Sequence, residues 1–200
     1  MGGWFNRKIE SIEDLKGLKI RMPGLGGKVI TRAGASSVLV AGGEIYTNLE
    51  RGVIDATEWL GPYHDYLMGF QDVASYYYTP GWHEPGSALD FFFNKEKLED
   101  LPADLQAILK QAALSVNHWV LSHFEYENAR YMEKILAERK VEVVQWPSEV
   151  LDFLKERSRE VLEEEAQKDA LSRKVYDSYT EFLSSARKWS RYSEKSYHEL

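Results

Sequence analysis

The sequence GLKIRMPG at residues 17–24 decides the fold, because it joins an extended segment to a tight turn and then a helix. Its apolar positions predict a short strand over residues 19–22 that ends at the Pro-Gly turn. A short helix over residues 27–33 and a second strand over residues 37–40 follow. Strands that alternate with helices in this way favour a parallel sheet in an α/β fold.

The same alternation continues beyond the second strand. We expect helices over residues 44–50 and 62–70, and strands over residues 54–59, 76–78 and 89–93. The tyrosines of the strand over 76–78 are best explained as the core and rim of a buried strand. All 14 glycines lie between Gly2 and Gly86, so the composition changes after that point. We therefore divide the chain into an α/β lobe over residues 1–92 and a helical arm with two strands over residues 93–200.

The arm begins with a long predicted helix over residues 103–139, where apolar residues recur at a helical period without proline or glycine. At 1.5 Å per residue it would be roughly 50 Å long, longer than a small domain is wide. A strand over residues 141–146 and a helix capped by Ser148 follow. The terminal helix, from Arg173 onward, carries large aromatic residues: Tyr176, Tyr179, Phe182 and Trp189. One small lobe cannot cover such stripes, so we expect both helices to mediate self-association.

The composition is that of a folded chain, with 200 residues, 44% hydrophobic and 28% charged. Its formal charge of −7 argues against nucleic-acid binding, which basic patches favour. The absence of cysteine excludes disulfides, thiol catalysis and cysteine-ligated metals. No apolar run approaches the ~20 residues of a membrane span. The start, MGGWFNRKIE, lacks the pattern of a signal peptide, so we expect none in this chain.

Arg21 ends the first predicted strand, next to a glycine-rich turn at residues 23–28 where a phosphate loop would lie. The turn fails both common phosphate patterns, because Val29 stands where one requires glycine and the other serine or threonine. At the carboxyl end of a parallel strand, a guanidinium can bind a carboxylate through two parallel hydrogen bonds. The position of Arg21 alone is equally consistent with an ordinary surface arginine.

Two acidic residues lie on the next predicted strand. Asp55 and Glu58 fall on opposite faces of that strand, so their spacing excludes an acid–base pair. The simpler interpretation has Asp55 capping a turn and Glu58 in solvent. The alternative places Glu58 with Glu84 around a hard cation, which prefers carboxylate and carbonyl oxygens.

The histidines form no metal or catalytic pattern. His83, in the sequence WHEPG at residues 82–86, is half of a zinc motif, but no second histidine follows four residues later. His118 and His123 lie five apart on a helix and share no face, so we expect packing or solvent roles for them. No nucleophile with a neighbouring base can be assembled. The sequence therefore predicts a binding protein and not an enzyme.

Three motifs in order resemble one family. GLKIRMPG at 17–24, GGEIYTNLERGVIDATEW at 42–59 and YYTPGWHEPG at 77–86 are similar to the solute-binding proteins of tripartite ATP-independent periplasmic (TRAP) transporters. The likeness is strongest to the branch that binds 2-oxoacids and lactate, and it extends over nearly the whole chain. It implies a periplasmic, bilobed binding protein that passes a small 2-oxo or 2-hydroxy monocarboxylate to a membrane permease.

The resemblance also implies roles for four positions. Arg21 pairs with the substrate carboxylate, and Trp59 is a second substrate-binding residue. Glu58, the carbonyl of Trp59 and Glu84 hold a calcium or sodium ion that bridges the substrate to the protein. In this branch the terminal helices can be exchanged between two subunits, which implies a homodimer.

The family is longer than this chain, so we expect that the N-terminal lobe, the opposite wall of the cleft, is missing. Residues 1–92 then form the second lobe, and the strands of the arm return toward the first. An alternative is a truncated homologue that serves only as a helical self-association module. An enzyme that uses Glu58, Glu84 and His83 ranks last, because such clefts use these residues to hold a ligand.

Overall fold

The computed structural model describes residues 1–84, 86 and 89–198. A six-stranded sheet in the order β3-β2-β4-β1-β5-β6 lies at its centre. The strands are β1 Gly3–Phe5, β2 Lys19–Arg21, β3 Ser36–Ser37, β4 Ala56–Thr57, β5 Tyr76–Thr79 and β6 Glu142–Gln145. β2 runs parallel to β3 and β4, and β5 runs parallel to β6, whereas β1 is antiparallel to both β4 and β5. The α/β class is confirmed, but the expected all-parallel sheet is wrong at β1.

β1 is the central strand that the sequence did not reveal. Its three residues are too few to show the alternation by which strands are recognised, yet Trp4 and Phe5 are fully buried in it. Gly2, just before the strand, donates its backbone N–H to the carbonyl of Tyr78 at 2.7 Å. A Cβ atom at Gly2 would lie 2.8 Å from that same oxygen, so the approach of the two backbones requires glycine.

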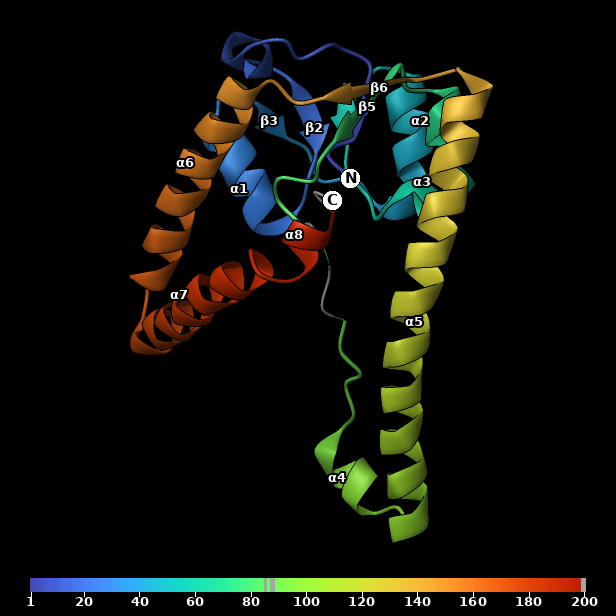
Figure 1. The fold of residues 1–200 in the computed structure, drawn as a ribbon, viewed down its shortest axis with the longest axis vertical. Helices are drawn as coiled ribbons and strands as arrows, with labels where there is room; N and C mark the ends of the chain where they lie inside the picture. The colour runs from blue at the N-terminus through green and yellow to red at the C-terminus, as the bar shows by residue number, and fades with distance from the viewer. Residues whose placement is uncertain (85, 87–88, 199–200) are drawn as a thin grey trace.

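The helices are α1 Gly24–Arg32, α2 Ile45–Glu50, α3 Pro62–Leu67, α4 Lys95–Glu99, α5 Ala103–Glu138, α6 Ser148–Ala166, α7 Ala170–Ser190 and α8 Glu194–His198, with short 3₁₀ turns at Ile12–Leu15, Gly42–Glu44 and Phe70–Asp72. In Figure 1, α1 and α6 lie on one side of the sheet, and α2, α3 and the C-terminal end of α5 lie on the other. Each side has its own hydrophobic core. The helices therefore cover both faces of the sheet, as its largely parallel pairing requires.

The strand predicted over residues 89–93 is wrong. This segment is coil, and its large side chains are exposed, namely Leu89, Phe91, Phe92 and Phe93. Without a neighbouring strand to satisfy its backbone, an aromatic segment does not form a stable strand. Residue 85 of the third motif lies outside the described residues, as do residues 87–88, which follow that motif.

The arm has one strand among its described residues, not two. The predicted strand over 141–146 is observed as β6, which pairs with β5 in register Tyr76↔Glu142. The sheet thus takes strands from both sides of residue 92, and the division into 1–92 and 93–200 stays a prediction. The cap expected at Ser148 is shifted by one residue, because Pro147 is the extended N-cap and Ser148 already has helical geometry.

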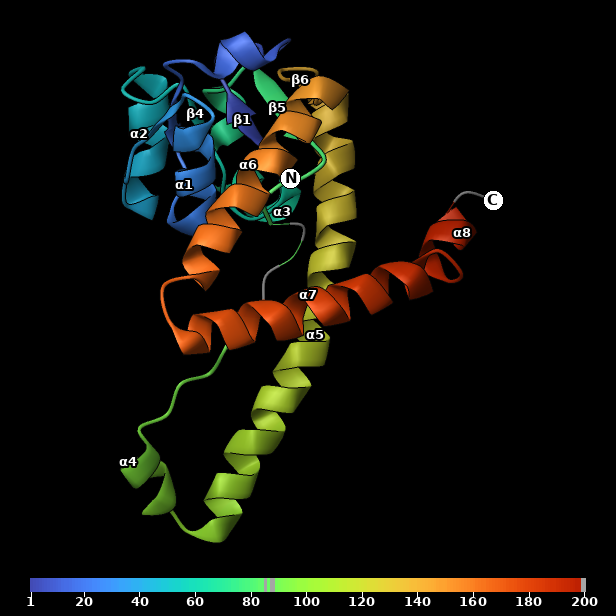
Figure 2. The same ribbon diagram turned by 90° about the vertical axis from the view of Figure 1, so that its left-hand side faces the viewer.

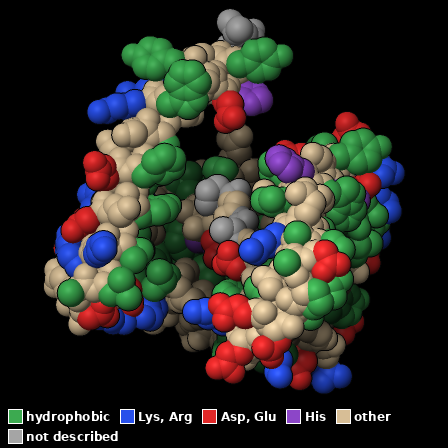
Figure 3. All heavy atoms as spheres, turned by 90° about the horizontal axis from the view of Figure 1, so that it is seen from below, with side chains coloured by type: hydrophobic (Ala, Val, Ile, Leu, Met, Phe, Trp, Pro, Cys, Tyr) green, Lys and Arg blue, Asp and Glu red, His purple; other side chains and the backbone are tan. Residues whose placement is uncertain are grey.

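Helices α5 and α7 extend far from the sheet. The long helix α5 is confirmed at 36 residues, yet Ile135 is its one buried residue. Figure 2 shows α7 extending sideways from the lower end of α6, away from the sheet. Viewed from below, hydrophobic side chains gather on the two parts of the molecule that project from the sheet, with a hollow between them (Figure 3). No helix in the described ranges combines the length and apolarity needed to cross a bilayer.

Candidate functional site

The carboxyl ends of β2 and β4 bring two predicted site residues together. The parallel register places Arg21 opposite Thr57, so Glu58 leaves its strand beside Arg21. Nη1 of Arg21 donates to Oε1 of Glu58 at 2.7 Å. The two side chains are 12% and 6% exposed. Glu58 is therefore not in solvent, contrary to the simpler expectation, because the neighbouring strand supplies a cation that compensates its burial.

Further contacts fix the orientation of Arg21. Its Nε donates to the carbonyl of Val40 at 3.4 Å. The guanidinium carbon lies 5.2 Å from the centre of the Trp59 ring, within cation–π range. Trp59 thus contacts the predicted carboxylate anchor directly.

His83 is the third member of the cluster, and the sequence associates it with Glu58 only in the enzyme alternative, not among the predicted ligand-binding residues. Its Nε2 lies 3.5 Å from Oε2 of Glu58, and its side chain is 7% exposed. Its Nδ1 is buried and has no hydrogen-bond partner among the residues that the structure describes. His83 follows β5, whose carboxyl end lies at the same edge of the sheet as those of β2 and β4. β1 lies between β4 and β5 and is antiparallel to both, so β4 and β5 end at the same edge of the sheet. That shared edge is the signal that could have identified His83 as a site residue.

Glu84 differs from Glu58 in its exposure. Its side chain is exposed, and no hydrogen bond or ion pair joins it to the described residues of the site. Within the described ranges, no three histidine or acidic residues gather as metal-ligand clusters do. The carboxylate of Glu58 and the carbonyl of Trp59 are hard oxygen donors of the kind that calcium and sodium accept. The chemistry of these two donors fits such a cation, and the role of Glu84 stays a prediction.

Asp55 lies outside the cluster. Its Oδ2 accepts a hydrogen bond from the backbone N–H of Lys19 at 2.8 Å. This bond joins the start of β2 to the segment before β4. Asp55 is thus bonded at the start of β2, whereas Glu58 pairs with Arg21 at its end, so the two acids do not form a pair. The opposite strand faces and the turn cap expected from the sequence stay predictions.

A buried carboxylate supports the loop that follows Glu58 and Trp59. Oδ1 of Asp65 accepts from the backbone N–H groups of Leu60 and Gly61, both at 3.0 Å. Its Oδ2 accepts from the indole of Trp4 at 2.8 Å. Burial raises the pKa of Asp65 to about 6, although the three donors act in the opposite direction. Asp65 thereby ties the site loop to the central strand β1.

The cluster is separate from a groove on the α1 side of the sheet. This groove has a volume of about 580 Å³ and lies between α1 and α6. It is crossed by ion pairs that join Lys28 to Glu165 and Arg32 to Glu164. Arg21, Glu58 and His83 are not among its lining residues. The cluster therefore lies at the carboxyl edge of the sheet, apart from this groove.

Comparison with known proteins gives a consistent result. Residues 1–169 match the family described as bacterial extracellular solute-binding protein, family 7 (DctP). A monocarboxylate 2-oxoacid-binding periplasmic protein of Nostoc sp. is 41% identical over 197 residues, which are 98% of this chain and 54% of that protein. The chain therefore spans about half the length of this curated relative.

Two crystal structures share the fold along the whole chain. A TRAP periplasmic solute-binding protein of Colwellia psychrerythraea, with bound calcium and pyruvate, matches at a TM-score of 0.95 and 38% identity, over 100% of this chain and 61% of that one. A TRAP protein of Pseudoalteromonas atlantica, with bound sodium and pyruvate, matches at 0.94 and 39%, over 100% and 60%. The resemblance drawn from the three motifs is confirmed.

Proposed function

Because the chain belongs to family 7 of the bacterial extracellular solute-binding proteins, we propose that it forms one wall of a TRAP solute-binding site for a small 2-oxo or 2-hydroxy monocarboxylate. The family is periplasmic and serves transport. The chain matches 54% of its curated relative, so the substrate, the permease partner and the periplasmic location of this protein all belong to the proposal. The observation that carries it is the buried Arg21–Glu58 pair at the carboxyl ends of two parallel strands.

Arg21 is the proposed anchor for the carboxylate of the acid. Its guanidinium is held by Val40 and Trp59, so its donors stay aligned while it changes partner. A fixed guanidinium can give two parallel hydrogen bonds to a carboxylate, which lysine cannot. Trp59 supplies an apolar face beside it.

Glu58, the carbonyl of Trp59 and Glu84 are the proposed ligands of a calcium or sodium ion. The pyruvate-bound relatives from Colwellia and Pseudoalteromonas contain calcium and sodium, respectively. When bound, such an ion supplies positive charge between the acid and the protein. Glu84 is exposed whereas Glu58 is buried, so Glu84 would reach such an ion from the solvent side.

Residues 1–92 are the proposed second lobe of a bilobed protein, with the arm over 93–200 reaching toward the first. A bilobed site gains affinity when two walls close on the ligand and exclude water. Residues 1–200 span 54% of the curated relative, so we expect these residues by themselves to bind an acid with a dissociation constant in the millimolar range or weaker, a binding free energy of about 4 kcal/mol or less.

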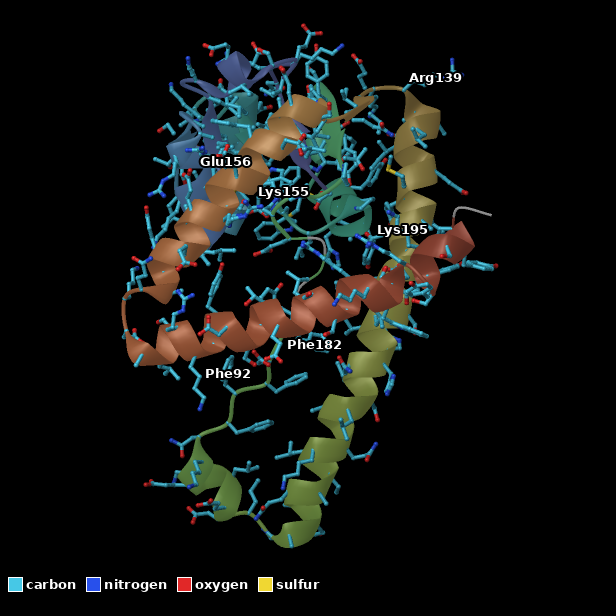
Figure 4. The ribbon with its side chains drawn as sticks, turned by 60° about the vertical axis from the view of Figure 1, so that its left-hand side comes forward. Phe92, Arg139, Lys155, Glu156, Phe182 and Lys195 are labelled. Atoms are coloured by element: carbon cyan, nitrogen blue, oxygen red, sulfur yellow. The ribbon has the colours of Figure 1, made fainter. Side chains whose placement is uncertain are left out.

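A homodimer is proposed through α5 and α7. Large apolar side chains are exposed on α5 and on α7, including Leu105, Ile108, Trp119, Val175, Tyr179, Phe182 and Trp189. Phe92, in the coil before α4, and Phe182, on α7, lie outside the sheet body in Figure 4. Exposed apolar area of this extent marks an association surface. Sedimentation velocity tests it: the parent should be dimeric, Phe182→Asp with Trp189→Asp should be monomeric, and a parent monomeric at all concentrations would refute it.

The acid site is tested by NMR titration of pyruvate and lactate in the presence of calcium, which detects millimolar binding. Arg21→Lys keeps a positive charge beside Glu58 but loses the two-pronged donor, so the dissociation constant should rise roughly tenfold or more. Arg32→Lys is the matched control, because Arg32 also pairs with a glutamate but lies between α1 and α6. Equal affinity of parent and Arg21→Lys would refute the assignment.

A further inference from the structure

Arg21 and Glu58 neutralise one another within the chain. The proposed function gives each residue a different ligand: Arg21 binds the acid, and Glu58 binds the cation. Their atoms are 2.7 Å apart, and little of either side chain reaches solvent, 12% and 6%. When one member of such a buried pair is taken away, the other is left as an uncompensated charge, which is strongly unfavourable.

Both carboxylate oxygens of Glu58 lie beside a neighbouring side chain in this arrangement. Oε1 accepts from Arg21, and Oε2 lies 3.5 Å from Nε2 of His83. His83 is itself buried, so it screens that side of the carboxylate from solvent. A cation that binds Oε1 of Glu58 would therefore have to displace Arg21 from it, and a cation that binds Oε2 would meet His83.

Arg21 faces the corresponding restriction. A carboxylate that captured Arg21 alone would leave Glu58 charged and buried, with Nε2 of His83 3.5 Å from its Oε2. The contacts of Arg21 with the Val40 carbonyl and the Trp59 ring do not use the Glu58 carboxylate, so they persist when the pair separates. The guanidinium can thus exchange one carboxylate for another without leaving its place.

We propose that the Arg21–Glu58 pair opens only when both members receive new partners together, so that acid and cation bind cooperatively and each alone binds poorly. The inference rests on the proposed function and adds that the binding of the acid and the binding of the cation depend on one another. When the acid and the cation are both present, separation of Arg21 from Glu58 replaces one compensated buried ion pair by two. When only one of them is present, the separation leaves one buried charge without a partner. By thermodynamic linkage, the factor by which the cation raises the affinity for the acid must equal the factor by which the acid raises the affinity for the cation.

The test follows the Arg21 guanidinium and Trp59 indole signals of the ¹⁵N-labelled chain by NMR. Pyruvate is added as its tetramethylammonium salt in sodium-free buffer, with and without calcium chloride, and calcium is added with and without pyruvate. We expect calcium to lower the dissociation constant of pyruvate by about tenfold or more, and pyruvate to do the same for calcium. Equal pyruvate constants with and without calcium would overturn the inference and leave the proposed function standing. No shift at about 50 mM pyruvate with calcium would overturn both.

A variant separates this mechanism from an ordinary loss of the site. Glu58→Gln keeps the shape of the side chain but removes its charge, so Arg21 has no ionic partner to abandon. Pyruvate should then bind without calcium at least as well as it binds the parent without calcium, and calcium should have no further effect. Glu164→Gln, in the exposed pair with Arg32, should keep the full calcium effect of the parent. Persistent calcium dependence in Glu58→Gln would contradict the inference, and if that variant does not fold, the parent titrations decide alone.

Discussion

Two arginine–glutamate pairs in this chain have the same chemistry and different surroundings. Arg32 donates two hydrogen bonds of 2.7 Å to Glu164, from α1 to α6, and both side chains are substantially exposed. Arg21 donates one bond of 2.7 Å to the Glu58 carboxylate, at a sheet edge where both are buried. The exposed pair has the better hydrogen-bond geometry. The buried pair nevertheless has the larger consequences, because water cannot replace a partner that is removed there.

The largest difference should be in stability when one partner is removed. Arg21→Met leaves Glu58 buried without a cation, so we expect the free energy of unfolding to fall by about 3–5 kcal/mol. Arg32→Met leaves Glu164 in solvent and should change it little. Denaturant unfolding of each variant measures both effects.

The double variant Arg21→Met with Glu58→Gln sharpens the same comparison. It removes both charges, so it should recover most of the stability lost in Arg21→Met. A double variant no more stable than Arg21→Met would mean that the uncompensated charge is not the cause.

A second buried carboxylate, Asp65, extends the comparison to a group held by neutral donors. Asp65→Ala leaves the indole of Trp4 and two backbone N–H groups without an acceptor, which should cost about 3 kcal/mol of unfolding free energy. Asp65→Asn keeps an oxygen for part of this set and should lose less. A cost for Asp65→Ala no greater than that of an exposed carboxylate, as in Glu164→Ala, would show that the loop does not depend on it.

The pH dependence of Asp65 has a definite sign. Its pKa in the folded chain is raised from 3.8 to about 6, so the folded state binds the proton more readily than the unfolded state does. The parent should therefore gain stability relative to Asp65→Asn as the pH falls from about 6 to about 4, by up to about 3 kcal/mol. Unfolding free energies of both proteins at several pH values check this. A difference that stays constant, or that changes in the opposite direction, would contradict the assignment.

The sequence anticipated those parts of the fold and site that have a local signal. The strand before the Pro-Gly turn, the helix α5 and the position of Arg21 follow from period, proline and glycine, or strand ends. The strand β1 could not be recognised, because three residues carry no period and its burial comes from distant partners. His83 depended on β1, since its proximity to Glu58 follows from the strand order. The 89–93 segment shows the reverse error, in which aromatic content alone predicted a strand that has no partner.

The smallest expected effect distinguishes the two pairs by salt. The Debye length is about 3 Å at 1 M ionic strength, so exposed charges are screened and buried charges much less. Any stability difference between the parent and Arg32→Met should vanish at high salt, whereas the loss in Arg21→Met should remain. Unfolding curves of the three proteins at low and high potassium chloride provide the measurement. Equal salt sensitivity of the two losses would show that the Arg21–Glu58 pair is as open to solvent as the other.

The most direct test of the Arg21 site compares the guanidinium signals of Arg21 and Arg32 in one sample. With calcium present, pyruvate is added to the ¹⁵N-labelled chain, and the side-chain resonances of both arginines are followed by NMR. We predict that the Arg21 signals and the Trp59 indole signal shift with a common saturation curve, while those of Arg32 stay in place. Shifts of equal size and affinity at both arginines, or at Arg32 alone, would contradict the assignment of the acid site to the Arg21–Glu58 pair.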